Sequence, residues 1–136
     1  MTEKIEWTNA FETGLSEIDA QHRQLFGLLN NLIDLEDLEV SSIVLEKTVD
    51  DLVEYAATHF QTEERLFEMC GYPNANAHIA EHSAFVGKLV DIRDQLMAED
   101  SKVAGDVIRF LSRWLVNHVK VSDRAYIATF KANGVG

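Results

Sequence analysis

The sequence predicts an all-α fold, namely an up-down-up-down antiparallel four-helix bundle with an N-terminal arm. Apolar residues recur every three to four positions along four long stretches, which is the period of amphipathic helices. Proline occurs once and glycine seven times in 136 residues, so few positions interrupt a helix. Each stretch corresponds to a helix of roughly 30 Å, and short connections between helices of matched length make neighbours antiparallel. We therefore expect one domain over residues 1–136.

The arm and the first helix open the chain. Residues 1–15 precede the first apolar stripe. They carry Trp7 and Phe11, and this arm is expected to pack across the bundle. The first helix covers about 17–37. Ser16 is its expected N-cap, with the acidic Asp19 three residues further on, as in a capping box.

The other three helices follow from their apolar stripes and stop residues. The second covers about 43–70 and ends at Gly71, with Pro73 just beyond. Glycine followed by proline is a strong helix stop, because glycine accepts the left-handed conformation and proline cannot continue a helix. The third helix covers about 75–98 and the fourth about 102–131.

The composition excludes several classes of protein. With 46% apolar and 26% charged residues, the chain lies in the range of globular domains. Acidic residues outnumber basic ones 23 to 12, and the formal charge of −11 disfavours binding to nucleic acid or anionic lipid. Cys70 is the single cysteine, so neither an intrachain disulfide nor a cysteine zinc site is expected. Without a secretory leader or a long apolar stretch, we expect a cytoplasmic monomer with no membrane insertion.

The histidines carry the functional information. A core stripe takes about three of every seven helix positions, so five histidines would all fall on such stripes by chance roughly once in 70 trials. His59 and Glu63 are four residues apart, as are His78 and His82, so each pair shares one helix face. All five histidines lie on the predicted stripes: His22, His59, His78, His82 and His118.

One further pair has a different spacing. Asp123 follows His118 by five residues, which on a regular helix is about 140° away. Either Asp123 reaches around the helix, or the helix widens into a π-bulge, a feature that often marks a functional site.

These ligand types predict a two-metal centre. Imidazoles and carboxylates without thiolates suit iron, manganese, zinc or copper, and five imidazoles are too many for one tetrahedral zinc. Two ions bridged by carboxylates would lie roughly 3.5–4 Å apart. Five imidazoles, two bridging carboxylates and one bridging oxygen leave one position open on a pair of six-coordinate ions. That position is expected on the ion with fewer histidines.

The whole pattern resembles the hemerythrin family, and in particular its bacterial single-domain members. The resemblance runs along nearly the whole chain, and seven ligand residues in the right order make it specific. Besides the arm residue Trp7, it rests on these motifs: Asp19-Ala-Gln-His22, His59-Phe60-x-x-Glu63-Glu64, Gly71-Tyr72, His78-x-x-x-His82, Trp114-Leu115-x-x-His118 and Asp123-x-x-Tyr126.

The resemblance implies reversible dioxygen binding at a non-haem di-iron centre, for oxygen storage, delivery or sensing. One iron would be held by His78, His82 and His118. The other, with the open position, would be held by His22 and His59. Glu63, Asp123 and an oxo or hydroxo group would bridge the two ions. The residues that match the family's apolar dioxygen pocket are Leu25, Phe60, Trp114, Leu115 and Val119. Tyr126 is expected to hydrogen-bond beside Asp123 and support it.

Other interpretations remain open. His78-Ile-Ala-Glu81-His82 matches the inverted zinc-peptidase motif, with Glu81 as general base. That interpretation leaves three histidines unexplained, and we expect Glu81 to be a solvent-facing residue whose change to alanine keeps metal and oxygen binding. Ferritin-like oxidases need Glu-x-x-His twice, and the sequence has none.

The same site residues could also serve a different role. We expect a binding protein and not an enzyme, but a di-iron enzyme that reduces peroxide or nitric oxide would use the same ligands. An oxygen-sensing module cut from a chemoreceptor is a further alternative. The possible protein partners are accordingly an oxygenase or a fused signalling domain.

Overall fold

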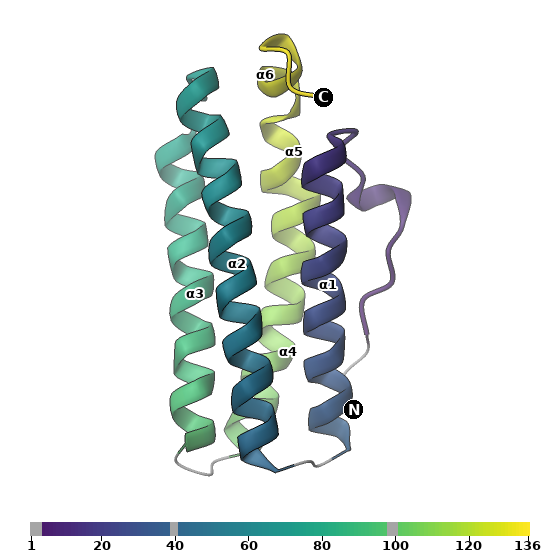
Figure 1. Cartoon of the computed structure of the whole chain (residues 1–136), viewed down its shortest axis with the longest axis vertical. Coiled ribbons are helices and arrows are strands. Elements are labelled where there is room, and N and C mark those ends of the chain that lie inside the picture. The colour runs from purple at the N-terminus through teal and green to yellow at the C-terminus, as the bar shows by residue number, and fades with distance from the viewer. Residues whose placement is uncertain (1–3, 39–40, 98–100) are drawn as a thin grey trace.

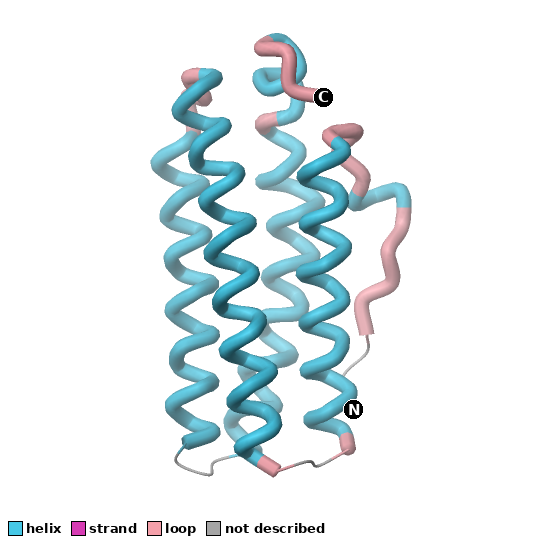
Figure 2. Tube along the Cα trace, in the orientation of Figure 1, coloured by secondary structure: helices cyan, strands magenta, loops and turns pink. Residues whose placement is uncertain are grey.

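The protein is helical throughout the part that the structure describes. The computed structural model describes residues 4–38, 41–97 and 101–136. Within these ranges every regular element is a helix and no strand occurs, which confirms the predicted all-α class. The four long helices lie side by side, an arrangement consistent with a four-helix bundle (Figures 1 and 2). They are α1 (Ser16–Asp37), α2 (Ser42–Cys70), α3 (Ala75–Met97) and α4 (Ser101–Asn117).

The N-terminal arm runs along the outside of α1 and leads into it through a tight turn (Figure 1). The Trp7 ring lies 5.6 Å from that of Phe11 and 5.5 Å from that of Phe26 on α1, so the arm packs on the bundle as predicted. The N-cap of α1 is Leu15, and Ser16 is already the first helical residue, so the predicted Ser16 cap is wrong.

The carboxylate of Asp19 in the first turn of α1 binds the residues that precede the helix. It accepts hydrogen bonds from the backbone N–H of Thr13 at 2.9 Å and of Gly14 at 3.2 Å. It also accepts the hydroxyl of Thr13 at 2.8 Å. Because Asp19 reaches back to residues before the helix, it ties the arm to α1 close to His22, one turn further on.

The second helix ends as the sequence predicts. Gly71 is its C-cap and has a φ of 65°, in the left-handed region that favours glycine. Its N–H donates to the carbonyl of Phe67, and the same carbonyl accepts the N–H of Tyr72 at 3.0 Å. Only a few residues separate α2 from α3, which places the two helices side by side (Figure 1).

The predicted fourth helix is divided in the structure. After α4 the chain forms a π-helical turn, η2 (His118–Ser122), and then the short helices α5 (Asp123–Ala125) and α6 (Ile127–Ala132). Of the two possibilities for the His118 and Asp123 spacing, the structure therefore shows the π-bulge. A π-turn adds one residue per turn, so residues five apart come onto the same face.

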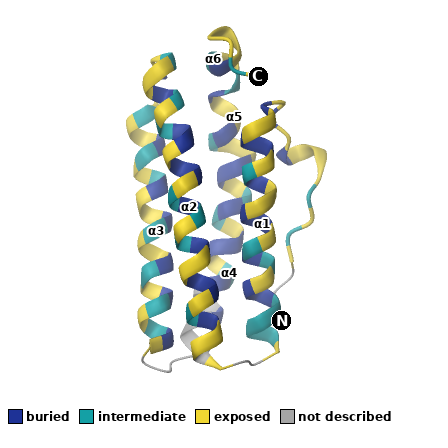
Figure 3. Cartoon of the chain, viewed as in Figure 1, coloured by how far each residue is buried: buried dark blue, intermediate teal, exposed yellow. Residues whose placement is uncertain are grey.

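The buried residues form stripes along the inner sides of the long helices (Figure 3). The larger apolar cluster lies on one side of the histidines and includes Leu29, Leu52, Leu89 and Leu111. A smaller cluster on the other side includes Phe67, and its remaining buried members are Leu15, Ile18, Tyr72, Tyr126 and Phe130. Among the described residues, no helix carries an apolar stretch long enough to cross a bilayer.

Candidate metal centre

The bundle brings together the side chains of all seven predicted ligands. They come from α1, α2, α3, η2 and α5, and each is buried, with at most 3% of its surface exposed. Burying so many ionisable groups is costly unless they are paired or coordinate metal. The residues are His22, His59, Glu63, His78, His82, His118 and Asp123.

Asp123 lies between two groups of histidines. Its Oδ2 is 3.0 Å from Nε2 of His22. Its Oδ1 is 2.9 Å from Nε2 of His78 and 3.2 Å from Nε2 of His118. One carboxylate oxygen therefore faces each group, which is the geometry that a bridging carboxylate needs.

Glu63 also lies between histidines. Its Oε1 is 3.2 Å from Nε2 of His59, one turn before it on α2, and 3.2 Å from Nε2 of His82 on α3. Two sets of potential ligand atoms result, each with all its atoms within 4.8 Å of one another. Both sets contain Glu63 and Asp123. One adds His78, His82 and His118, and the other adds His22 and His59.

The closeness of these atoms is not explained by hydrogen bonds. Nε2 of His22, His78, His82 and His118 and all four oxygens of Glu63 and Asp123 are buried without a hydrogen-bond partner. Buried polar atoms that lack partners are rare in folded proteins, and each needs an explanation. Nitrogen and oxygen lone pairs that converge on shared points, rather than on one another, fit metal ions. The residues present therefore fit a two-metal centre.

Hydrogen bonds on the outer side of three imidazoles hold the rings in place. Nδ1 of His59 lies 2.7 Å from Oε1 of Gln21, and Nδ1 of His82 lies 3.0 Å from Oε2 of Glu64. A ring that donates Nδ1–H to an oxygen presents Nε2 as a lone pair toward the centre. Such bonds fix both the tautomer and the orientation that a metal ligand requires.

Glu81 does the same for His118. Its Oε1 lies 3.1 Å from Nδ1 of His118 and accepts the hydroxyl of Ser122 at 2.8 Å. Glu81 is half-buried and holds the π-turn at both ends, so the expectation of a merely solvent-facing residue is wrong. It is also absent from both ligand sets, which gives no support to the zinc-peptidase interpretation.

The comparisons with known proteins agree with this geometry. The Hemerythrin HHE cation binding domain matches residues 13–130. The chain belongs to the hemerythrin family. A bacteriohemerythrin of Methylococcus capsulatus is 36% identical over 121 residues, covering 88% of this chain and 92% of the relative. One of Stenotrophomonas maltophilia is 32% identical over 127 residues, covering 93% and 82%.

A solved structure gives the same result for the fold. A crystal structure of wild-type hemerythrin matches with a TM-score of 0.85 and 32% identity, covering 94% of this chain and 98% of that one. The resemblance predicted from the sequence motifs is therefore confirmed, and so is the assignment of the chain to a helical, metal-binding family.

Apolar side chains enclose the centre in this member of the family. The Phe60 ring stacks on His82, with centroids 3.8 Å apart and planes 7° apart. The Trp114 ring stacks on His118 at 4.5 Å and 9°. Of the predicted pocket residues, Trp114 is half-buried. The other four are buried: Leu25, Phe60, Leu115 and Val119.

Tyr126 packs beside His78, one of the candidate ligands. Its ring is buried, stacks on Phe130 at 4.3 Å and lies 5.7 Å from that of His78. Its hydroxyl has no hydrogen-bond partner among the described residues, so the predicted bond beside Asp123 is not seen. Burial, with the charges of Asp123 and Glu63, raises the pKa of Tyr126 well above its usual value and keeps the hydroxyl protonated.

The charges of the centre shift several pKa values when no metal is bound. Burial lowers the pKa of His118, but contact with Asp123 outweighs burial and raises it to about 9. Burial and Asp123 act to raise the pKa of Glu63, but His59 and His82 outweigh them and lower it to about 2. The carboxylates are thus charged, and His118 tends to hold a proton that a metal ion would displace.

We expect the stability of the metal-free protein to depend on pH in two steps. The pKa of His118 rises on folding from 6.5 to about 9, so its contribution is complete below pH 6.5 and is lost as the pH rises through 9. The pKa of Glu63 falls from 4.5 to about 2, so its contribution is complete above pH 4.5 and is lost toward pH 2. Thermal unfolding followed from pH 2 to 10 should show the highest Tm between 4.5 and 6.5.

The iron-loaded protein is the control for this prediction. Metal binding requires His118 without its proton, so loaded protein should not lose stability between pH 6.5 and 9. A Tm of metal-free protein that is constant from pH 6.5 to 10 would contradict the proposed contact between His118 and Asp123.

Proposed function

We propose that this chain is an up-down-up-down antiparallel four-helix bundle that binds dioxygen reversibly at a non-haem di-iron centre. The observation that carries the proposal is the pair of ligand sets, one with three histidines and one with two, that share Glu63 and Asp123. Membership of the hemerythrin family and its bacteriohemerythrin relatives support the choice of iron.

The division of ligands supports a single open position. His78, His82 and His118 with the two carboxylates and a bridging oxo or hydroxo group would complete one six-coordinate ion. The set with His22 and His59 has one ligand fewer, and dioxygen would bind there. When bound, the iron pair supplies the electrons that reversible dioxygen binding requires.

The surroundings of the centre favour carriage of dioxygen over its turnover. An enzyme that reduces peroxide or nitric oxide needs access for protons and water, whereas carriage needs their exclusion. Leu25 lies one turn after His22 and is fully buried, and Phe60 lies beside His59 with ring centroids 5.7 Å apart. The two-histidine set is therefore bordered by apolar side chains. We infer a binding protein that stores, delivers or senses dioxygen.

Oxygenation of the iron-loaded protein tests this function. Anaerobic, reduced protein with about two irons per chain should develop a visible charge-transfer band in air. The band should disappear when oxygen is removed and return on re-exposure, because an apolar site protects the bound state. Repeated absorption spectra through several oxygenation cycles provide the measurement.

Two results would overturn the proposal. Protein that binds a single zinc ion per chain, with no iron after anaerobic loading, would rule out a di-iron centre. Fully loaded protein whose spectrum does not change in air would rule out dioxygen binding. Rapid consumption of added peroxide or nitric oxide, without a reversible band, would instead support the enzyme alternative.

A further inference from the structure

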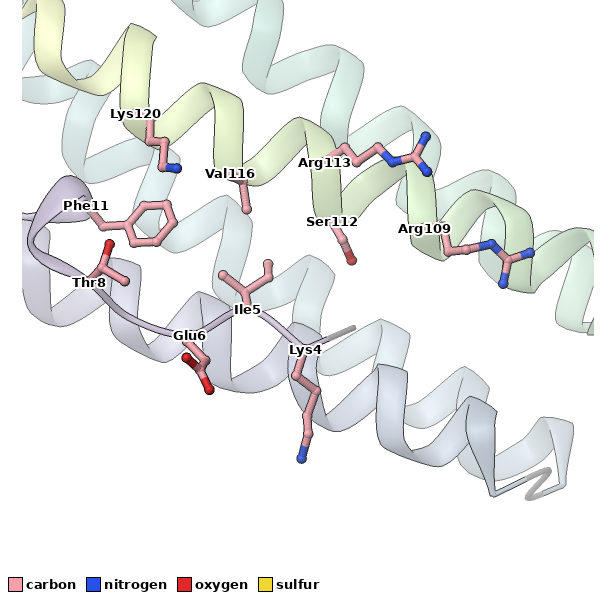
Figure 4. A pocket seen from close by; sticks show the side chains of 10 residues that line it. All are labelled: Lys4, Ile5, Glu6, Thr8, Phe11, Arg109, Ser112, Arg113, Val116 and Lys120. Carbon is pink, nitrogen blue, oxygen red and sulfur yellow. The ribbon is translucent and has the colours of Figure 1, made fainter. Parts of the chain in front are cut away.

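A cavity lies outside the candidate metal centre, between the N-terminal arm and α4 (Figure 4). Its volume is about 550 Å³, within the range of about 300–1,000 Å³ that is usual for small-molecule pockets. No residue that lines it is one of the seven proposed metal ligands. What the cavity could bind is therefore a question separate from dioxygen binding.

One face of the fourth helix forms the inner wall of this cavity. Arg109, Ser112, Arg113, Val116 and Lys120 line it and are spaced by one to four residues, so they share one side of α4 and η2. The residues that face the core, such as the metal-ligand candidate His118, lie on the other side of the helix. The cavity and the metal centre thus lie on opposite sides of the same helical segment.

The arm forms the outer wall and is held at both ends. The side-chain amide of Asn30 on α1 donates to the carbonyl of Ile5 at 2.8 Å and accepts its N–H at 2.7 Å. Further along, Arg124 donates to the carbonyls of Ala10 at 3.0 Å and Glu12 at 3.1 Å. Because these bonds fix the arm at a distance from α4, the cavity is preformed and is a built part of the fold.

The charge of the lining is opposite to that of the whole chain. Four of the 12 basic residues line the cavity, whereas only one of the 23 acidic residues does. That acid, Glu6, points away from α4 in Figure 4, and so does the basic Lys4, which forms an ion pair with Asp34 at 3.3 Å. The other three basic residues come from α4 and η2. In the described part of the chain, no carboxylate forms an ion pair with Arg113 or Lys120. The Lys120 ammonium instead lies 5.2 Å from the centre of the Phe11 ring.

The cavity also has an apolar part. Ile5 from the arm and Val116 from α4 face each other across it, and Phe11 lies at one end below Lys120 (Figure 4). Basic groups beside an apolar surface recognise molecules that carry an anion on an apolar body. We propose that this cavity binds a small organic carboxylate, whose charge is attracted by Arg113 and Lys120 on either side of Val116 along the helix. Its apolar body would lie against Ile5, Phe11 and Val116.

Calorimetric titration of the iron-loaded protein tests the ligand class. The probe is 4-phenylbutyrate, and the matched compounds are its neutral amide and acetate, which lack the charge and the apolar body respectively. We expect phenylbutyrate to bind at least roughly fivefold more tightly than either compound, because each lacks one of the two contacts. Equal binding of the acid and the amide would show that the basic residues do not recognise the ligand, and would overturn the proposal.

Substitutions in the lining test whether phenylbutyrate binds in this cavity. Arg113→Gln and Lys120→Gln should each weaken binding of phenylbutyrate by about threefold to fivefold, as expected for partly exposed charges. The controls Arg65→Gln and Lys47→Gln remove the same charges from exposed positions of α2 that do not line the cavity, and should leave affinity unchanged. Equal weakening by the control variants would mean that the ligand responds to overall charge, which would also overturn the proposal.

The visible band of the oxygenated centre gives a second readout. Phenylbutyrate bound in the cavity should leave this band in place, because the cavity lies on the far side of the helix. A band that disappears in proportion to bound phenylbutyrate, equally in the wild type and in Lys120→Gln, would show that the carboxylate binds iron instead. Failure of this proposal would not affect the proposed dioxygen binding, which is measured without the probe.

Discussion

Replacing Asp123 by asparagine should abolish the two-metal centre. Asparagine keeps the size of the side chain but offers one carbonyl oxygen and an amide nitrogen that does not bind metal. In the structure each carboxylate oxygen of Asp123 faces a different histidine group, at 2.9–3.2 Å. The bridge therefore cannot form in the variant, and iron content should fall from about two ions per chain to about one or none. Metal analysis after anaerobic loading measures this loss.

A matched control is available on the surface. Asp91→Asn makes the same change at an exposed position of α3 and should keep full iron content. In the metal-free state, Asp123→Asn should also remove the main cause of the raised pKa of His118. The loss of stability between pH 6.5 and 9 should then disappear. An Asp123→Asn protein that retains two tightly bound irons would show that this carboxylate is not a bridge.

The overall class and the positions of the inward side chains could be predicted from sequence because they depend on periodicity. Residues four apart on a helix must share a face, so His59 with Glu63 and His78 with His82 required no tertiary information. The end of α2 at Gly71 depends on the local conformational preference of glycine, so it could also be predicted from the sequence. The five-residue spacing before Asp123 left two possibilities, and only the structure distinguishes the π-turn from a side chain that reaches around the helix.

The residues that support the imidazoles could not be assigned in this way. Gln21, Glu64 and Glu81 each hydrogen-bond a histidine on a different helix, 18 to 38 positions away in sequence. Such contacts depend on how neighbouring helices are rotated and shifted, which the period of one helix does not specify. The sequence offered one indication of these supporting residues, namely that each is next to a proposed ligand. Gln21 precedes His22, Glu64 follows Glu63 and Glu81 precedes His82.

Glu81 gives the second large effect that we expect. Nδ1 of His118 lies 3.1 Å from its Oε1, and this oxygen also accepts the hydroxyl of Ser122 at the other end of the π-turn. Glu81→Ala would leave the outer nitrogen of His118 without this acceptor and would release one constraint on the π-turn. Loss of such a partner typically costs about 10- to 100-fold in metal affinity. Competition with a chelator, followed by iron release, measures the change.

Two variants separate this role from a general loss of stability. Glu81→Gln keeps a carbonyl oxygen that can accept from His118, so most of the affinity should return. Glu68→Ala removes a carboxylate from an exposed position of α2 and should have no effect on iron release. If iron leaves Glu81→Ala and wild-type protein at the same rate, the hydrogen bond does not contribute to metal binding and Glu81 is a surface residue. If the glutamine variant behaves like the alanine variant, it is the negative charge of Glu81, rather than its ability to accept a hydrogen bond, that retains the metal at His118.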